Sequence, residues 1–170
     1  VFLRGKKEFY DKAEVIVPSW RNALVISMAV WFTIQLALPL RHWFFKDDVL
    51  WTEEGHRLSW RMMLRGKSGR AAFKVVEKGT SDTIFIDNAD YLSRKQRRAI
   101  TSKPDMIWQF AQRLKEDYAK KGKDVEVYVE GKVSVNGGPY KVLIDPNVDL
   151  ASEKWQHFKH HDWILPSEEK

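Results

Sequence analysis

The chain has 170 residues, enough for one domain of ordinary size with an appendage. Hydrophobic residues make up 44% and aromatic residues 13%, with eight Trp, so the chain can bury a core and carries many side chains suited to interfaces. Cysteine is absent, which excludes disulfide frameworks, thiolate metal sites and cysteine nucleophiles.

The net charge of +6 is unevenly distributed. Residues 91–123 carry ten Lys and Arg against three Asp and Glu, whereas residues 124–170 carry five against nine. A basic region of this kind can face anionic lipid headgroups, an acidic substrate or nucleic acid.

The N-terminal residues give no sign of a targeting segment. The first residue is Val1 rather than Met, and no basic stretch followed by a short apolar run opens the chain. We interpret the sequence as a segment of a longer protein, in which residues 1–21 form a loop preceding the next element.

Residues 22–40 form an uncharged stretch between Arg21 and Arg41, with Trp20 and Trp43 just outside it. A helix of that length spans roughly 28 Å, which is close to the hydrocarbon thickness of a bilayer. The stretch therefore predicts a transmembrane helix; the alternative is a buried core helix of a soluble domain. Basic residues at both ends leave the orientation open.

The next segment, residues 41–69, is dense in Trp, Arg and His. We expect a membrane-proximal, substrate-side loop there, with a short helix or strand near residues 58–64. In residues 70–87 two β-type runs, AAFKVV and TIFI, enclose the turn-like GTSD and predict a hairpin.

Residues 90–121 have helical character, with Ser93 as an N-cap and a break at Pro104. Apolar residues then recur at helical spacing, and Gly122 ends the pattern; they are Ile107, Phe110, Ala111, Leu114 and Tyr118. Residues 124–145 alternate as strands around Asn136-Gly137, a strong hairpin signal.

Together these elements predict an α+β fold, in which a transmembrane helix precedes a small domain of antiparallel strands packed with helices. The soluble domain is expected to cover residues 70–166, with 167–170 as a tail. Its last part, from Pro146, is aromatic but irregular, and Asp145-Pro146 suggests an Asx-type turn.

Three clusters could carry chemistry, and for each a plainer interpretation is favoured. His157, His160, His161 and Asp162 could ligate a metal, but their spacing fits no strong ligand pattern, so we expect a polar tail with adjacent His side chains on different sides and no metal. The basic run at Arg94, Lys95, Arg97 and Arg98 favours a solvated or lipid-facing surface over nucleic acid. The acid pairs Asp47/Asp48 and Glu53/Glu54 are expected to be solvated.

The most suggestive segment is residues 51–65, in which cations lie beside aromatic rings. Such a segment could bind a carboxylate through forked hydrogen bonds between apolar walls. Membrane anchoring through the same Trp and Arg side chains is the alternative. The candidate substrate-binding residues are Trp51, His56, Arg57, Ser59, Trp60, Arg61 and Arg65.

This segment also carries a resemblance to a known family. LWTEEGHRLSWRMML resembles the segment after the late transmembrane helices of vitamin K-dependent γ-glutamyl carboxylases, which show a Trp-Thr…Ser-Trp-x-Met-Met pattern. PDMIWQFAQRL, KVSVN and LIDPNVDL resemble later family segments in the same order. The likeness covers roughly residues 20–166 and is greatest to the bacterial, HTTM-type branch. His56 and Arg65 stand where the animal enzymes have Tyr and His.

The resemblance implies a multi-pass membrane enzyme that oxidises a reduced quinone, vitamin K hydroquinone, with O₂. The base so formed removes a γ-proton from a peptidyl glutamate, and CO₂ adds to give γ-carboxyglutamate. Residues 51–65 match the part associated with binding the glutamate substrate, and the domain would lie on the extracytoplasmic side.

The resemblance also implies that the catalytic Lys and most of the quinone pocket lie upstream of Val1. No catalytic residue is therefore expected in this segment, which alone should be inactive. The expected partners are a glutamate-containing peptide and the lipid bilayer. The alternative function is a non-catalytic, membrane-anchored interaction module on the same scaffold.

Overall fold

The computed structural model describes residues 17–45, 47–59, 66–80 and 82–167. The chain divides into two units, Val1–Leu38 and Pro39–Lys170. The predicted substrate-binding residues Trp60, Arg61 and Arg65, together with most of the element expected near residues 58–64, lie outside the described residues.

Helix α1, Arg21–Leu40, is the expected apolar helix. Its two hydroxyl groups are satisfied within the helix, because those of Ser27 and Thr33 donate to the backbone oxygens of Ala23 and Ala29 at 2.8 Å. Continued to Phe44, the helix is long and apolar enough to cross a membrane. A helix of this kind fits either a membrane span or a signal sequence.

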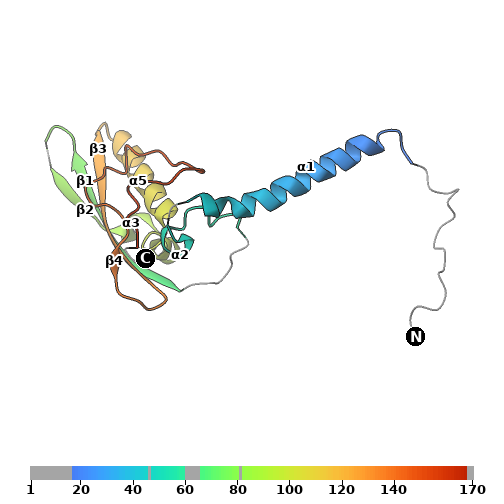
Figure 1. Ribbon diagram of the computed structural model, residues 1–170. Helices are drawn as coiled ribbons and strands as arrows, with labels where there is room; N and C mark the ends of the chain where they lie inside the picture. The colour runs from blue at the N-terminus through green and yellow to red at the C-terminus, as the bar shows by residue number, and fades with distance from the viewer. Residues whose placement is uncertain (1–16, 46, 60–65, 81, 168–170) are drawn as a thin grey trace. The chain divides into compact units, whose positions relative to one another are not determined.

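Four antiparallel strands form one sheet in the order β2-β1-β3-β4 (Figure 1). They are β1 Lys67–Glu77, β2 Thr83–Ile86, β3 Val125–Val135 and β4 Lys141–Val142. Together with the apolar helix and the helices packed on this sheet, they confirm the predicted α+β class.

Both predicted hairpins form. In the first, Phe73 lies opposite Ile86. In the second, Asn136 and Gly137 adopt positive φ angles of 51° and 78°, as a tight turn between antiparallel strands requires. Strand β1 begins earlier than its apolar pattern predicts, because Lys67 pairs with Val135 at the far end of β3.

Three helices connect β2 to β3: α3 Asn88–Tyr91, α4 Arg94–Ala99 and α5 Pro104–Ala119. The predicted cap of α4 is a complete capping box between Ser93 and Gln96. The basic side chains of α4 are exposed on its surface; they are Arg94, Lys95, Arg97 and Arg98.

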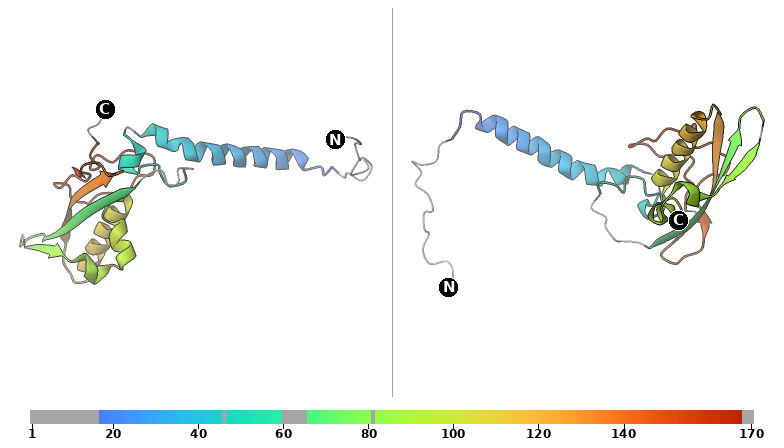
Figure 2. Two further views of the ribbon diagram at one scale, coloured as in Figure 1. Left: turned by 90° about the horizontal axis from the view of Figure 1, so that it is seen from below. Right: turned by 180° about the vertical axis from the view of Figure 1, so that it is seen from behind.

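The core lies between α5 and one face of the sheet (Figure 2). All five residues of the predicted apolar stripe of α5 are buried. The rings of Phe110 on α5 and Phe73 on β1 meet edge to face, with centroids 4.8 Å apart. Gly122, with φ of 75°, follows the end of α5, where its predicted stop falls.

The C-terminal segment is irregular but firmly attached to the sheet. The backbone N–H of Asp145 donates to Trp163 O, and that of Leu165 donates to Leu143 O, both at 2.9 Å. The predicted Asx turn is present, because Asp145 Oδ1 accepts from the N–H of Asn147 at 2.9 Å. Residues 163–165 thus run alongside residues 143–145 and extend the β4 side of the sheet.

Candidate functional site

Where the structure describes it, the segment between α1 and β1 contains two short helices that the sequence did not predict: η2 Arg41–Phe44 and α2 Val49–Thr52. Asp48 caps α2 by accepting from the N–H of Leu50 at 2.8 Å. Helix α2 ends at Glu53, whose φ of 59° is left-handed and turns the chain toward the C-terminal segment.

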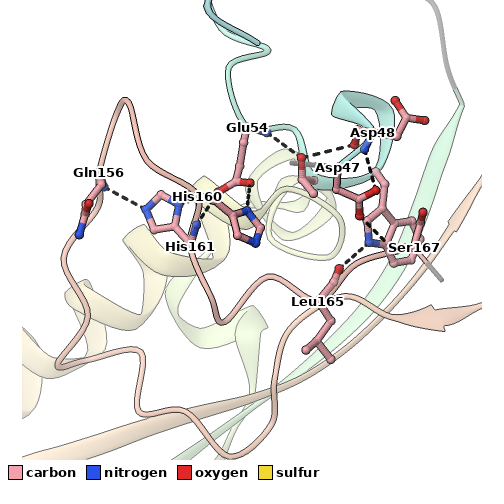
Figure 3. A network of polar contacts seen from close by, with 10 residues as sticks. Asp47, Asp48, Glu54, Gln156, His160, His161, Leu165 and Ser167 are labelled. Atoms are coloured by element: carbon pink, nitrogen blue, oxygen red, sulfur yellow. Dashed lines mark hydrogen bonds and ion pairs between the residues drawn. The ribbon is translucent and has the colours of Figure 1, made fainter. Parts of the chain in front are cut away.

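Hydrogen bonds from α2 and its flanks fix this segment against residues 160–167 (Figure 3). The buried indole of Trp51 donates through Nε1 to Leu165 O at 2.7 Å. Asp47 Oδ2 accepts from the N–H of Ser167 at 2.9 Å. Both bonds join residues far apart in sequence, so they position the loop after α2 as well as the tail.

Glu54 is the centre of this network. Its side chain is 1% exposed, and its carboxylate accepts three hydrogen bonds. His161 donates from its backbone N–H and from Nδ1, both at 2.8 Å, to Oε1. His160 Nδ1 lies 2.5 Å from Oε2. A buried carboxylate needs such partners because an uncompensated one would carry a large desolvation cost.

The geometry assigns a tautomer to His161. Its Nε2 accepts a hydrogen bond from the N–H of Gln156 at 2.9 Å, so Nε2 carries no proton. Nδ1 must then carry the proton that is donated to Glu54. His161 is therefore a neutral connector between Glu54 and the loop at Gln156.

An aromatic layer covers this connector. The Trp155 ring stacks on the His161 ring with centroids 4.4 Å apart, and Trp163 lies 5.3 Å from the same ring. Trp108 of α5 lies 5.8 Å from Trp155 and donates through Nε1 to Glu153 O. These contacts hold the C-terminal loop against α5.

A pocket of about 750 Å³ lies between the loop after α2, helix α5 and the C-terminal loop. Its size suits a peptide side chain or another small ligand. It is lined by Arg41, Phe45, residues 52–58, Lys103, Asp105, Trp108, Gln109, Gln112, residues 153–157 and His161.

The pocket lining contains equal numbers of cationic and carboxylate side chains, but not all of them are paired. Of its carboxylates, Glu54 is bound by histidines, Asp105 by Arg57 and Glu53 by Lys67. Glu153 is a fourth carboxylate in the lining. The lining also contains the cations Arg41, Lys103 and Lys154, none of which pairs with a carboxylate among the described residues.

Arg41 has one N–H donor that no described residue accepts. One of its terminal nitrogens donates to Arg57 O at 2.8 Å. Its buried Nε has no hydrogen-bond partner within the described part of the chain. A guanidinium with an unused N–H at the wall of a pocket can bind a carboxylate or phosphate oxygen.

The structure separates the predicted substrate-binding residues. His56 and Arg57 line the pocket, although Arg57 is paired with Asp105. Trp51 is buried in the core cluster, and the Ser59 hydroxyl donates to His56 O at 2.5 Å within the turn. Neither Trp51 nor Ser59 lines the pocket.

Two expectations about polar residues were wrong. Glu54 is buried rather than solvated, and its neighbour Glu53 lies beside the nearly buried ammonium of Lys67. Adjacent His160 and His161 do not point to different sides, because both rings reach Glu54. Among the described residues, no group of three or more His, Asp or Glu could hold a metal ion.

Sequence reasoning missed Arg41, Lys103, Lys154 and Trp155 as pocket residues. Isolated cations carry no motif, and these residues come from separate parts of the chain. The one available signal was the density of Trp in the C-terminal tail, which is typical of a covered, half-polar surface.

Residues 20–170 of the chain match the protein family described as "Vitamin K-dependent gamma-carboxylase, lumenal domain". The match includes the helix, the pocket and the Glu54 network. No solved structure is similar enough to the chain to count as a match.

Proposed function

Since the chain belongs to the family of the vitamin K-dependent gamma-carboxylase lumenal domain, we propose that it is the substrate-binding and structural part of a membrane carboxylase. The whole enzyme would convert peptidyl glutamate into γ-carboxyglutamate, coupled to epoxidation of a quinone in its hydroquinone form. Helix α1 would serve as a membrane span rather than a signal sequence, with the domain on the extracytoplasmic side.

Three cations in the pocket lining that pair with no described carboxylate carry this proposal. A glutamate side chain that enters would meet Arg41, Lys103 and Lys154, whose charges are not already neutralised by a described carboxylate. Phe45 and Leu58 lie in the same wall and would limit the access of water. Charge-assisted hydrogen bonds in a partly desolvated pocket are about twice as strong as neutral ones.

Glu54 is a positioning residue in this scheme. It connects the loop after α2 to His160 and His161, so both walls of the pocket depend on one carboxylate. The loop after α2 and the C-terminal loop are therefore held together before a ligand arrives, which lowers the entropic cost of binding.

The quinone implied by the family does not fit this pocket. The lining combines charged and amide side chains, whereas a quinone with an isoprenoid chain needs a mainly apolar site. We therefore assign this segment no step of quinone, O₂ or CO₂ chemistry, and no catalytic residue.

The test uses the full-length protein in membranes with a reduced quinone, O₂, labelled bicarbonate and a glutamate-containing peptide. Lys154→Gln should raise the KM for the peptide by about tenfold and leave kcat nearly unchanged, because a hydrogen bond to a charged group contributes about 1.5 kcal/mol. The control is Arg113→Gln, since Arg113 is an exposed cation of α5 that pairs with Asp117 outside the pocket.

Two outcomes would count against the proposal. If no reduced quinone supports incorporation of label, the chain is not part of a carboxylase, and peptide binding without incorporation would favour the interaction module. If Lys154→Gln and Arg113→Gln change KM equally, the pocket does not bind the substrate.

A further inference from the structure

Four large apolar side chains lie unusually exposed near the pocket. Trp43 and Phe44 of η2 are 70% and 86% exposed, Leu58 is 67% exposed and Phe158 is 75% exposed. Exposed aromatic and aliphatic side chains that gather in one place mark surfaces that bind another body.

The contacts of Arg41 show that Leu58 and Phe158 lie near η2, the helix that carries Trp43 and Phe44. Its guanidinium donates to Arg57 O at 2.8 Å, one residue before Leu58. The same guanidinium carbon lies 5.9 Å from the centroid of the Phe158 ring. The turn at residues 57–58 and the loop at Phe158 therefore lie within the reach of one arginine side chain.

The position of Arg41 in the sequence indicates the depth of these side chains relative to the bilayer. It is the first charged residue after the uncharged residues 22–40. If those residues span a bilayer, as the proposed function holds, Arg41 must lie at the headgroup level, where Arg side chains normally end a span. Whatever Arg41 touches must lie at that level too.

We propose that Trp43, Phe44, Leu58 and Phe158 form an interfacial patch that inserts into the boundary between headgroups and acyl chains. The occupant of this surface is the lipid bilayer. Exposed Lys159, next to Phe158, supplies with Arg41 the positive charge that favours anionic headgroups.

The proposal extends the proposed function, because Arg41 and Leu58 also line the pocket. The pocket then lies at the membrane surface rather than at the far end of the domain. An acidic peptide would be bound beside the bilayer, close to any chemistry carried out within the membrane.

The absence of cysteine allows a direct test with the 170-residue chain. Single cysteines would replace Phe158, Leu58, Phe85 or Trp31, and each would carry an environment-sensitive fluorophore. Phe85 is the matched control, because it is 72% exposed on β2. Trp31 reports on α1 itself.

Each labelled protein is reconstituted into phosphatidylcholine–phosphatidylglycerol vesicles and quenched, in separate samples, by lipids that carry a spin label near the headgroup or deep in the acyl chain. Quenching at positions 158 and 58 should exceed that at position 85 by about threefold, because interfacial groups lie about 5–10 Å deep. Aqueous iodide should give the opposite order.

The two proposals fail in different ways. If the label at position 31 is not quenched by the spin label deep in the acyl chain, α1 does not span the bilayer, and both the span and the patch are overturned. If position 31 is quenched but positions 158 and 58 behave like position 85, only the patch is overturned.

Discussion

At the scale of single residues, the sequence was least informative about Glu54. Adjacent acids in a loop are usually solvated, and nothing in residues 53–54 signals a partner more than 100 residues away. The buried carboxylate became visible only when the fold brought His160 and His161 to it, across separations of 106 and 107 residues.

Replacing Glu54 should therefore destabilise the domain. Glu54→Ala should lower the free energy of unfolding by about 3 kcal/mol, because it leaves buried histidine donors without an acceptor. Glu54→Gln should cost only about 1 kcal/mol, since its amide oxygen can still accept from His161.

Chemical denaturation of the chain in detergent measures these changes. The control is Glu130→Ala, an exposed acid on β3, which should change stability by less than about 0.5 kcal/mol. Equal effects of Glu54→Ala and Glu54→Gln would mean that the accepted hydrogen bonds contribute little.

At the scale of elements, much of the fold was predictable because the signals are local. The stripe on α5, the capping box at Ser93 and the Asn136-Gly137 turn each depend on residues that lie close together in the sequence. The start of β1 at Lys67 was not predictable, because only its pairing with β3 defines it.

Gly69 in β1 shows how closely the elements approach. A Cβ at this position would lie 1.9 Å from the backbone oxygen of Thr101, between α4 and α5. Gly69→Ala should therefore cost about 2–3 kcal/mol, since the backbone must move to relieve the overlap.

Gly131, on the neighbouring strand β3, is the matched control. A Cβ there would meet Ile144 Cγ1 at 3.4 Å, an ordinary contact. Gly131→Ala should change the midpoint of thermal unfolding little, whereas Gly69→Ala should lower it by about 8 °C or more for a domain of this size. If Gly69→Ala and Gly131→Ala gave the same midpoint of thermal unfolding, the backbone between α4 and α5 could move aside at little cost in free energy.

At the scale of the whole molecule, the sequence located only half of the candidate site. The sequence singled out residues 51–65 from their cations and aromatic rings, and residues 52–58 of this segment line the pocket. The opposite wall, residues 153–157 and α5, was not, because a pocket is defined by segments that meet only after folding.

Two lysines and two tyrosines with raised pKa values predict how the stability of the domain responds to alkaline pH. A hydrogen bond with Asp124 raises the pKa of Lys78, and one with Glu77 raises the pKa of Lys123. Burial raises the pKa of Tyr118, and a hydrogen bond to Glu126 raises that of Tyr128. In all four groups the folded state favours the protonated form.

This stabilisation is complete below the ordinary pKa values of 10.0 for Tyr and 10.5 for Lys and is lost as the pH rises through the raised values. The Tm should therefore be level between about pH 8 and pH 10 and fall above it. The double variant Lys78→Met/Lys123→Met should show a shallower fall. An identical profile for the variant would exclude these ion pairs as the cause.

The attachment of Asp47, Trp51 and Glu54 to residues 160–167 also has a consequence for the order of events during synthesis. A ribosome makes α1 and the loop after it long before the residues that hold that loop. On a nascent chain that has reached only Gln156, the polar groups of all three residues lack the partners that they have in the finished protein. The loop after α2 can therefore be fixed in its final place only after residues 160–167 have left the ribosome.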